Sequence, residues 1–274
     1  MPCIYGIRRH PLAMHLPTPE SPTDPRAQRN ADLLRLWRAV QASAVFVALL
    51  VVMFIAQGAL DWRAFAVAPG STHGLVGVLA APLLHGSLAH IAANAVSVLL
   101  LGTLAGGVYP RATLRALPLL WIGSGLGAWL LGDPGSHHLG ASGLTHGLMF
   151  LVFVLGLLRR DRPAIAAGMI AFFLYGGMLL TVLPQEPGVS WQSHLGGALA
   201  GVLSAWLFRR SDPVAPRRKY SWELEEETES DARQAEQAQF EPPRPDEVPV
   251  LWQRQAEDGR GVMLRFPRPP SGED

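Results

Sequence analysis

The chain has 274 residues, of which 49% are hydrophobic and only 16% are charged, and its formal net charge is +1. Soluble domains carry about 25% charged residues, so this composition indicates a membrane protein with polar ends. The basic residues are scattered rather than gathered on one face, which argues against a nucleic-acid partner, and the single cysteine, Cys3, excludes a disulfide framework.

Both ends of the chain are polar. Residues 1–38 are rich in proline and arginine and predict a disordered cytoplasmic N-terminal tail. Residues 211–274 combine acidic runs and prolines with few apolar side chains, which predicts a second disordered cytoplasmic tail. We expect no secretory signal, because no apolar core or small-residue cleavage site stands early in the sequence.

Between the tails, residues 39–210 contain six apolar segments. These lie at about 40–60, 85–104, 114–131, 141–158, 163–183 and 192–208. Most are close to the roughly 20 residues that a helix needs to cross a bilayer core, although the second, fourth and sixth reach it only with their polar first turns included. The sequence therefore predicts an all-α, polytopic membrane protein with a bundle of six transmembrane helices.

The basic residues predict the orientation of this bundle. Of the 23 basic residues, only Arg63 lies in a segment that six spans would place on the outer side. Cytoplasmic loops carry the excess of arginine and lysine, so both termini are expected in the cytoplasm. Lys219 is the only lysine, a bias typical of GC-rich bacterial genomes, and the membrane is therefore expected to be a bacterial inner membrane.

Polar side chains gather at one depth in the even-numbered spans. His90, Asn94, Ser142, His146 and His194 all lie within roughly the first ten residues of a segment that enters from the outer side. At 1.5 Å per residue, this places them about 0–15 Å below the outer boundary. Polar residues at such depth are costly and normally face a bundle interior or a water-filled cavity, so we expect a shared polar site.

Small residues indicate which helices meet there. Gly143 and Gly147 in the fourth span, and Gly197 and Gly201 in the sixth, form two faces that permit close approach of helix backbones. Taken alone, such faces and a serine between glycines are ordinary helix packing. If the two faces meet, however, Ser142 comes within hydrogen-bond reach of a histidine of the sixth span.

That arrangement would suit nucleophilic catalysis. A serine hydroxyl is inert until a base takes its proton, and His194 is the candidate base for Ser142. His90 and Asn94 share a face at i and i+4, and both are donors suited to a developing oxyanion. The adjacent His137 and His138 lack acidic or cysteine partners at ligand spacing, so neither a metal nor another cofactor is expected.

Three motifs resemble those of rhomboid intramembrane serine proteases, and together they cover the six-span core. They are His85-Gly-Ser-Leu-Ala-His90-Ile-Ala-Ala-Asn94, Gly140-Ala-Ser142-Gly143 and Ser193-His194-Leu-Gly-Gly197-Ala-Leu-Ala-Gly201. The resemblance implies a Ser142–His194 dyad, with an oxyanion hole formed by the Ser142 amide, His90 and Asn94. It also implies single-span membrane proteins as substrates, cut near the outer face and usually after a small residue.

One of the departures from the family pattern lies beside the expected dyad. His146 stands where the family usually has an aromatic ring stacked on the catalytic histidine, so it is a possible modulator of the dyad. Two alternatives remain open at this level. A catalytically silent relative would bind membrane helices without cutting them, and a small proton-coupled transporter would use His90, His146 and His194 as a relay.

Overall fold

The computed structural model of the protein describes residues 25–184, 188–213 and 221–240. Over these residues the structure is helical, and its one strand-like feature is an isolated antiparallel bridge between Val67 and His138. The chain forms two units, Met1–Pro216 and Arg217–Asp274. The first unit holds the helical bundle and the second holds a single described helix, α8 (Ser221–Phe240).

The bundle contains seven of the described α-helices and four short 3₁₀ turns. The α-helices are α1 (Pro25–Ala56), α2 (Gly74–Ala80), α3 (Leu88–Val108), α4 (Pro110–Leu131), α5 (Ser142–Arg159), α6 (Arg162–Tyr175) and α7 (Trp191–Phe208). The 3₁₀ turns are η1 (Gln57–Ala59), η2 (Trp62–Phe65), η3 (Ala81–Leu83) and η4 (Gly176–Leu179).

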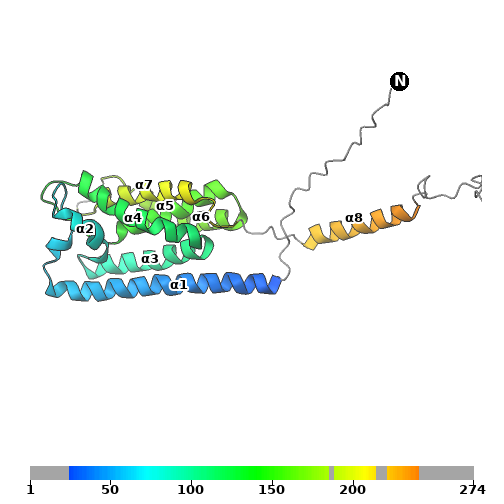
Figure 1. Ribbon diagram of the computed structural model, residues 1–274, viewed down its shortest axis with the longest axis horizontal. Coiled ribbons are helices and arrows are strands. Elements are labelled where there is room, and N and C mark those ends of the chain that lie inside the picture. Colours follow the sequence, from blue (N-terminus) through cyan, green and yellow to red (C-terminus); the bar gives the residue numbers. More distant parts are fainter. Residues whose placement is uncertain (1–24, 185–187, 214–220, 241–274) are drawn as a thin grey trace, which may run out of the picture. The chain divides into compact units, whose positions relative to one another are not determined.

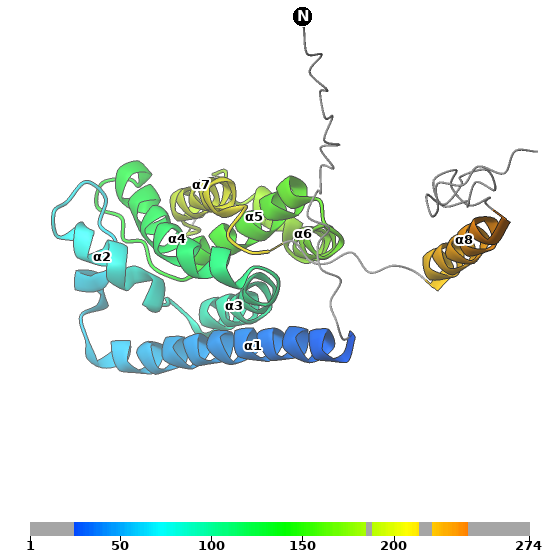
Figure 2. The ribbon, with the colours of Figure 1, turned by 45° about the vertical axis from the view of Figure 1, so that its right-hand side comes forward.

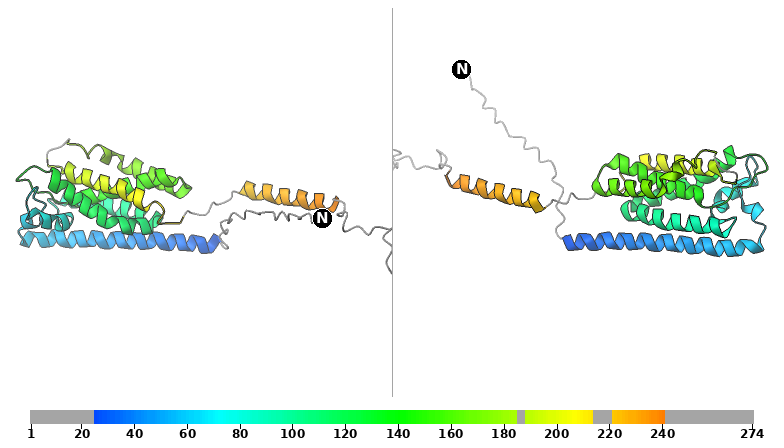
Figure 3. Two further views of the ribbon diagram at one scale, coloured as in Figure 1. Left: turned by 45° about the horizontal axis from the view of Figure 1, so that its top comes forward. Right: turned by 180° about the vertical axis from the view of Figure 1, so that it is seen from behind.

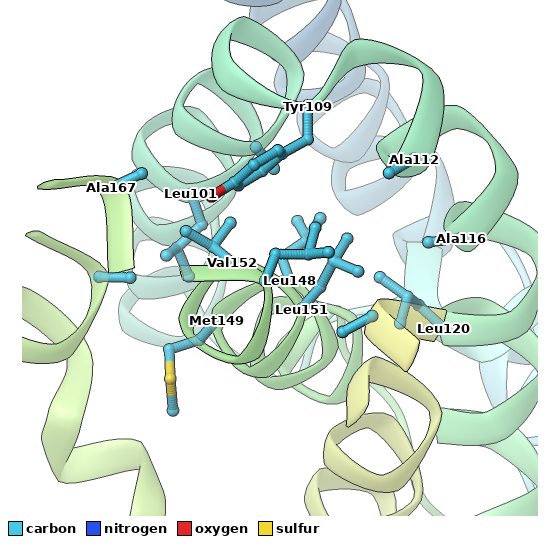
Figure 4. Packing of buried hydrophobic residues seen from close by; sticks show 14 of the residues in the cluster. Leu101, Tyr109, Ala112, Ala116, Leu120, Leu148, Met149, Leu151, Val152 and Ala167 are labelled. Atoms are coloured by element: carbon cyan, nitrogen blue, oxygen red, sulfur yellow. The ribbon is translucent and has the colours of Figure 1, made fainter. Parts of the chain in front are cut away.

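Helix α5 is the centre of this bundle. It packs against α3, α4, α6 and α7, and 61% of its apolar window is buried, compared with 17–33% for the other candidate spans. Leu148, Leu151 and Val152 of α5 face Leu120 of α4 and Tyr109 in the buried cluster shown in Figure 4. A helix enclosed in this way holds its first residue in a fixed position, and for α5 that residue is Ser142.

The remaining helices pack on α5 or on its neighbours. Helix α1 runs along α3 at the side of the bundle, as Figure 1, Figure 2 and Figure 3 all show, and α7 packs against both α4 and α5. The short helix α2 lies at the end of the bundle and packs on α4. The segment 61–84, between the first two predicted spans, is thus folded into η2, α2 and η3.

The opposite end of the bundle is closed by a set of ionic and backbone contacts. The carboxylate of Asp212 accepts hydrogen bonds from the main-chain N–H groups of Arg111 and Ala112, each at 2.9 Å, and so caps the first turn of α4. Arg159 pairs with Asp161 at 3.1 Å and donates to the Asp212 and Pro213 carbonyl oxygens at 2.8 Å. The bundle therefore extends past residue 210, to 213.

Two segments of the tails that were expected to be disordered are helical in the structure. Helix α1 begins at Pro25, so residues 25–38 are helical, and α8 covers Ser221–Phe240. Both segments are rich in alanine, arginine, glutamine, leucine or glutamate, which are strong helix formers. Spaced ion pairs add to this tendency, Asp32 with Arg35 in α1 and Glu229 with Arg233 in α8. Residues 1–24 and 241–274 lie outside the described part of the chain.

Among the described residues, five helical segments are long and apolar enough to cross a membrane, namely α1, α3, α4, α5 and α6 together with η4, against six spans predicted. Helix α7 occupies the place of the predicted sixth span, but its first turn holds Gln192, Ser193 and His194 and is strongly polar. The predicted fifth span is also interrupted, because α6 ends at Tyr175 and η4 follows at a Gly-Gly pair. Glycine is a poor helix former, which explains this change.

Candidate active site

Ser142 stands at the start of α5, directly after a sharp turn. Gly140 has φ +113°, a backbone conformation that suits glycine, and its N–H donates to the Ala81 carbonyl at 2.9 Å. The Ser142 carbonyl accepts hydrogen bonds from Thr145 Oγ1 at 2.8 Å and from His146 Nδ1 at 2.7 Å. The N–H of Ser142, in the first turn of the helix, has no partner within the helix.

His194 lies in the first turn of α7, and its ring reaches Ser142. Nε2 of His194 is 2.9 Å from Ser142 Oγ, and Nδ1 is 3.0 Å from the main-chain oxygen of Thr181. A carbonyl oxygen only accepts hydrogen bonds, so Nδ1 carries the proton. The neutral ring therefore presents the lone pair of Nε2 to the serine hydroxyl.

The two helices approach each other through their glycines, as the sequence predicts. A Cβ added to Gly197 would lie 1.9 Å from the Gly143 oxygen, and one added to Gly201 would lie 2.4 Å from the Gly147 oxygen. Any side chain at these positions would force the backbones apart. Backbone contact of α5 with α7 is thus what brings Ser142 and His194 together.

His90 and Asn94 come from α3 and lie beside the turn that precedes Ser142. A Cβ added to Gly140 would be 2.7 Å from His90 Nε2 and 3.6 Å from Asn94 Nδ2, so both side chains lie against the backbone that precedes Ser142. Asn94 is buried, and its Nδ2 has no hydrogen-bond partner in the described structure. A buried hydrogen-bond donor without a partner destabilises the fold. It is able to donate to a group that enters the site from outside.

These residues share a cavity of about 960 Å³. Its wall combines the dyad and the two donors with other polar residues from the segments before α3, α5 and α7, among them His137 and His138. The cavity brings together a nucleophile, a base and hydrogen-bond donors, which is the arrangement that acyl transfer requires.

The family model of the rhomboid domain matches residues 72–211, just over half of the chain, and this range contains every residue of the site. The chain belongs to the rhomboid family. It is also 42% identical over 161 residues to uncharacterized proteins of Mycobacterium bovis and Mycobacterium tuberculosis. An uncharacterized protein of Mycobacterium leprae is 38% identical over 157 residues.

These matches are partial on both sides. The first two cover 56% of this chain and 65% of each relative, so the chain spans slightly less than two thirds of their length. The third covers 54% of this chain and 60% of the relative. With its apolar helices, membership of the rhomboid family makes the chain an integral membrane protein.

His146 occupies a position at which the sequence of this rhomboid departs from the family pattern. Its ring stacks on that of His194, with centroids 3.8 Å apart and planes inclined by 12°. Its two nitrogens bond to the Ser142 carbonyl and to Thr181 Oγ1, the latter at 2.8 Å. The imidazole therefore takes the place of an aromatic ring without competing for the serine hydroxyl.

Two residues of the site were not predicted from the sequence. Thr181 contacts both histidine rings, and a lone threonine in an irregular segment gives no pattern that would indicate this. His85 belongs to the first family motif but was given no role of its own, and it is fully buried next to the ring of His90, with centroids 5.1 Å apart. Gln57 bonds both the N–H and the carbonyl of His85, which fixes this position from η1.

Burial also determines the charge of His85. Desolvation, and to a smaller extent the neighbouring His90, lower the pKa of His85 from 6.5 to about 4. The ring is therefore neutral near pH 7, and its Nε2 accepts a long hydrogen bond of 3.5 Å from the N–H of Ala141. His85 thus supports the turn that precedes Ser142.

His137 and His138, the pair weighed as metal ligands, line the cavity but make other contacts. His138 lies between Ser136 Oγ at 2.9 Å and Ser190 Oγ at 2.7 Å, and so joins the segment before α5 to the start of α7. Burial lowers the pKa of His138. Over the described residues, no group of three or more histidine, cysteine or acidic side chains is close enough to hold a metal ion.

Proposed function

We propose that this rhomboid is an intramembrane serine endopeptidase in which Ser142 is the nucleophile and His194 its general base. The observation that carries the proposal is the 2.9 Å separation of Ser142 Oγ from His194 Nε2, the ring nitrogen that has no proton. Rhomboid membership supports the same reaction class. The substrates are single-span membrane proteins, and the reaction is hydrolysis of a peptide bond.

The first half of the reaction forms an acyl-enzyme. Ser142 Oγ attacks the carbonyl carbon of the scissile bond while its proton passes to His194 Nε2. The Nδ1 proton stays on the ring and remains hydrogen-bonded to the Thr181 carbonyl, which favours the imidazolium that forms. The tetrahedral oxyanion is bound by the Ser142 N–H, His90 and Asn94 Nδ2, and its collapse releases the amine with the proton held by His194.

The second half of the reaction needs water. A water molecule in the cavity gives its proton to His194 and attacks the acyl carbon, and breakdown of this second intermediate restores Ser142. The polar lining of the cavity supports access of water to the dyad. A helical substrate must unwind to place a peptide bond there, because the carbonyl groups of an intact helix are already hydrogen-bonded.

The proposed location follows from the charges. The end of the bundle opposite the dyad holds Arg111, Arg115, Arg159 and Arg209. Positive side chains mark the cytoplasmic side of a membrane protein, so the dyad lies near the outer face and both termini lie in the cytoplasm. For a bacterial chain, the membrane is the inner membrane.

The proposal is tested with purified protein in detergent and in liposomes. Labelling by a fluorophosphonate probe and cleavage of a model single-span protein are measured for the wild type, Ser142→Ala and His194→Ala. Both variants are expected to lose labelling and cleavage while keeping the melting temperature of the wild type. Cleavage that persists in Ser142→Ala would show that the nucleophile is wrong.

A matched serine variant controls for general effects on α7. Ser204 is fully buried in the same helix as His194, about three turns away, and its Oγ has no partner among the described residues. Ser204→Ala is expected to label at the wild-type rate. If the wild type itself neither labels nor cleaves, the chain is a silent member of the family that binds membrane helices.

A further inference from the structure

Thr181 is bonded to both histidine rings of the site. Its main-chain oxygen accepts from His194 Nδ1 at 3.0 Å, and its side-chain Oγ1 is 2.8 Å from His146 Nε2. His146 in turn donates from Nδ1 to the Ser142 carbonyl at 2.7 Å, and His194 Nε2 returns to Ser142 Oγ at 2.9 Å. Four hydrogen bonds thus form a closed circuit that begins and ends at Ser142.

Each bond of this circuit restricts the next. The carbonyl of Ser142 can only accept, so the proton of neutral His146 lies on Nδ1 and its Nε2 accepts from the hydroxyl of Thr181. That bond holds Thr181, whose carbonyl keeps the proton of His194 on Nδ1. The stacked rings, 3.8 Å apart, further limit rotation of His194. In the described part of the chain, no carboxylate is bonded to either ring.

We propose that Thr181 is the positioning residue of the dyad and that it acts through His146 and its own carbonyl to keep His194 in the tautomer that accepts the Ser142 proton. This inference rests on the proposed function, because it assigns a role within the same reaction. In a catalytic triad, a carboxylate selects the tautomer of the base. Here a main-chain oxygen does so, and the His146–Thr181 bond holds that oxygen in place.

The location of Thr181 gives this arrangement a consequence. Thr181 follows η4, in the segment that continues from α6, whereas the dyad belongs to α5 and α7. Thr181 Oγ1 also lies 3.1 Å from the Met178 carbonyl, which is the alternative acceptor for its hydroxyl proton. Orientation of the base therefore depends on a third element of the bundle, and loss of one hydroxyl is expected to weaken it.

The first test compares three variants by steady-state cleavage of a single-span substrate and by rates of fluorophosphonate labelling. Thr181→Val keeps the side-chain shape but removes the hydroxyl, and it is expected to lower kcat and the labelling rate by about threefold to tenfold with KM unchanged. Thr181→Ser keeps the hydroxyl and is expected to restore the wild-type rate to within about twofold. Thr113→Val, at a buried threonine whose Oγ1 has no partner, is the control and should change neither.

The second test asks whether Thr181 and His146 act along one path. His146→Phe keeps a stacked ring but removes both of its hydrogen bonds. The double variant Thr181→Val/His146→Phe is expected to be no slower than the slower single variant, since both changes break the same circuit. Multiplying losses, or equal loss in Thr181→Val and Thr181→Ser, would overturn the proposal.

The third test does not depend on activity. Ring ¹⁵N chemical shifts of His194, assigned by comparison with His194→Ala, report which nitrogen carries the proton. The wild type is expected to show the Nδ1–H tautomer, and Thr181→Val a mixture with Nε2–H. A wild-type Nε2–H tautomer would refute the positioning role. Nδ1–H in a wild type that does not label would instead refute the proposed protease while upholding the arrangement of Thr181.

Discussion

Asn94 is the residue whose energetic cost to the fold is most directly linked to its proposed role in catalysis. Its side chain is buried, and Nδ2 has no partner among the described residues, although a modest change to leucine would remove the unpaired donor. An oxyanion in the cavity would supply the missing acceptor. We expect Asn94→Ala to lower kcat by roughly 10²–10³-fold with little change in KM, because the bond is made only in the transition state. Steady-state cleavage of a single-span substrate measures this. A rise in KM alone would assign Asn94 to substrate binding instead.

At the same scale, sequence patterns identified side chains but not main-chain groups. Ser142 and His194 were predicted from their depth and from the glycines beside them, and the structure places their atoms within hydrogen-bond distance. The contribution of Thr181 was not predictable, since any residue has a carbonyl and only the path of the chain after η4 brings this one to His194. His146 was predicted to be unusual, but no sequence pattern predicts its hydrogen bonds to Ser142 and Thr181.

At the scale of helices, the close contact between α5 and α7 depends on glycines, which have no side chain. Gly197→Ala would place a methyl group 1.9 Å from the Gly143 oxygen, so the helices must separate. Overpacking of this kind costs about 1–3 kcal/mol. We therefore expect a lower melting temperature and a lower rate of fluorophosphonate labelling. Gly58→Ala is the control, because no heavy atom lies within 4 Å of the added Cβ. Equal behaviour of the two variants would mean that backbone contact does not align the dyad.

The observed helix boundaries agree with the predicted ones wherever hydropathy alone determines where a helix ends. The fourth predicted span, 141–158, agrees closely with α5 (Ser142–Arg159), whose interior is continuously apolar. The predicted and observed helix boundaries differ where other effects dominate. Helix α1 extends back to Pro25 through good helix formers that a hydropathy pattern does not register, and α6 stops at Tyr175 because a Gly-Gly pair lies inside an otherwise apolar run.

At the scale of the whole bundle, the arginine side chains and the candidate active site lie at opposite ends. The dyad and its cavity lie at the end that carries α2, whereas Arg115, Arg159 and Arg209 belong to the end closed by Asp212. Translocating a positive loop is unfavourable, so this asymmetry supports the proposed orientation of the bundle as a unit. In that orientation, the proposed nucleophile would meet the part of a substrate that lies close to the outer face.

Single cysteines test that orientation in cells. In a Cys3→Ser background the chain has no other thiol, and His137→Cys and Arg210→Cys introduce one at exposed positions at opposite ends of the bundle. A membrane-impermeant maleimide is expected to label His137→Cys in intact cells, and Arg210→Cys only after permeabilisation. The reverse pattern would place the dyad at the cytoplasmic face. Substrates would then be cut on that side, and the distribution of arginine would reflect packing at the Asp212 end rather than topology.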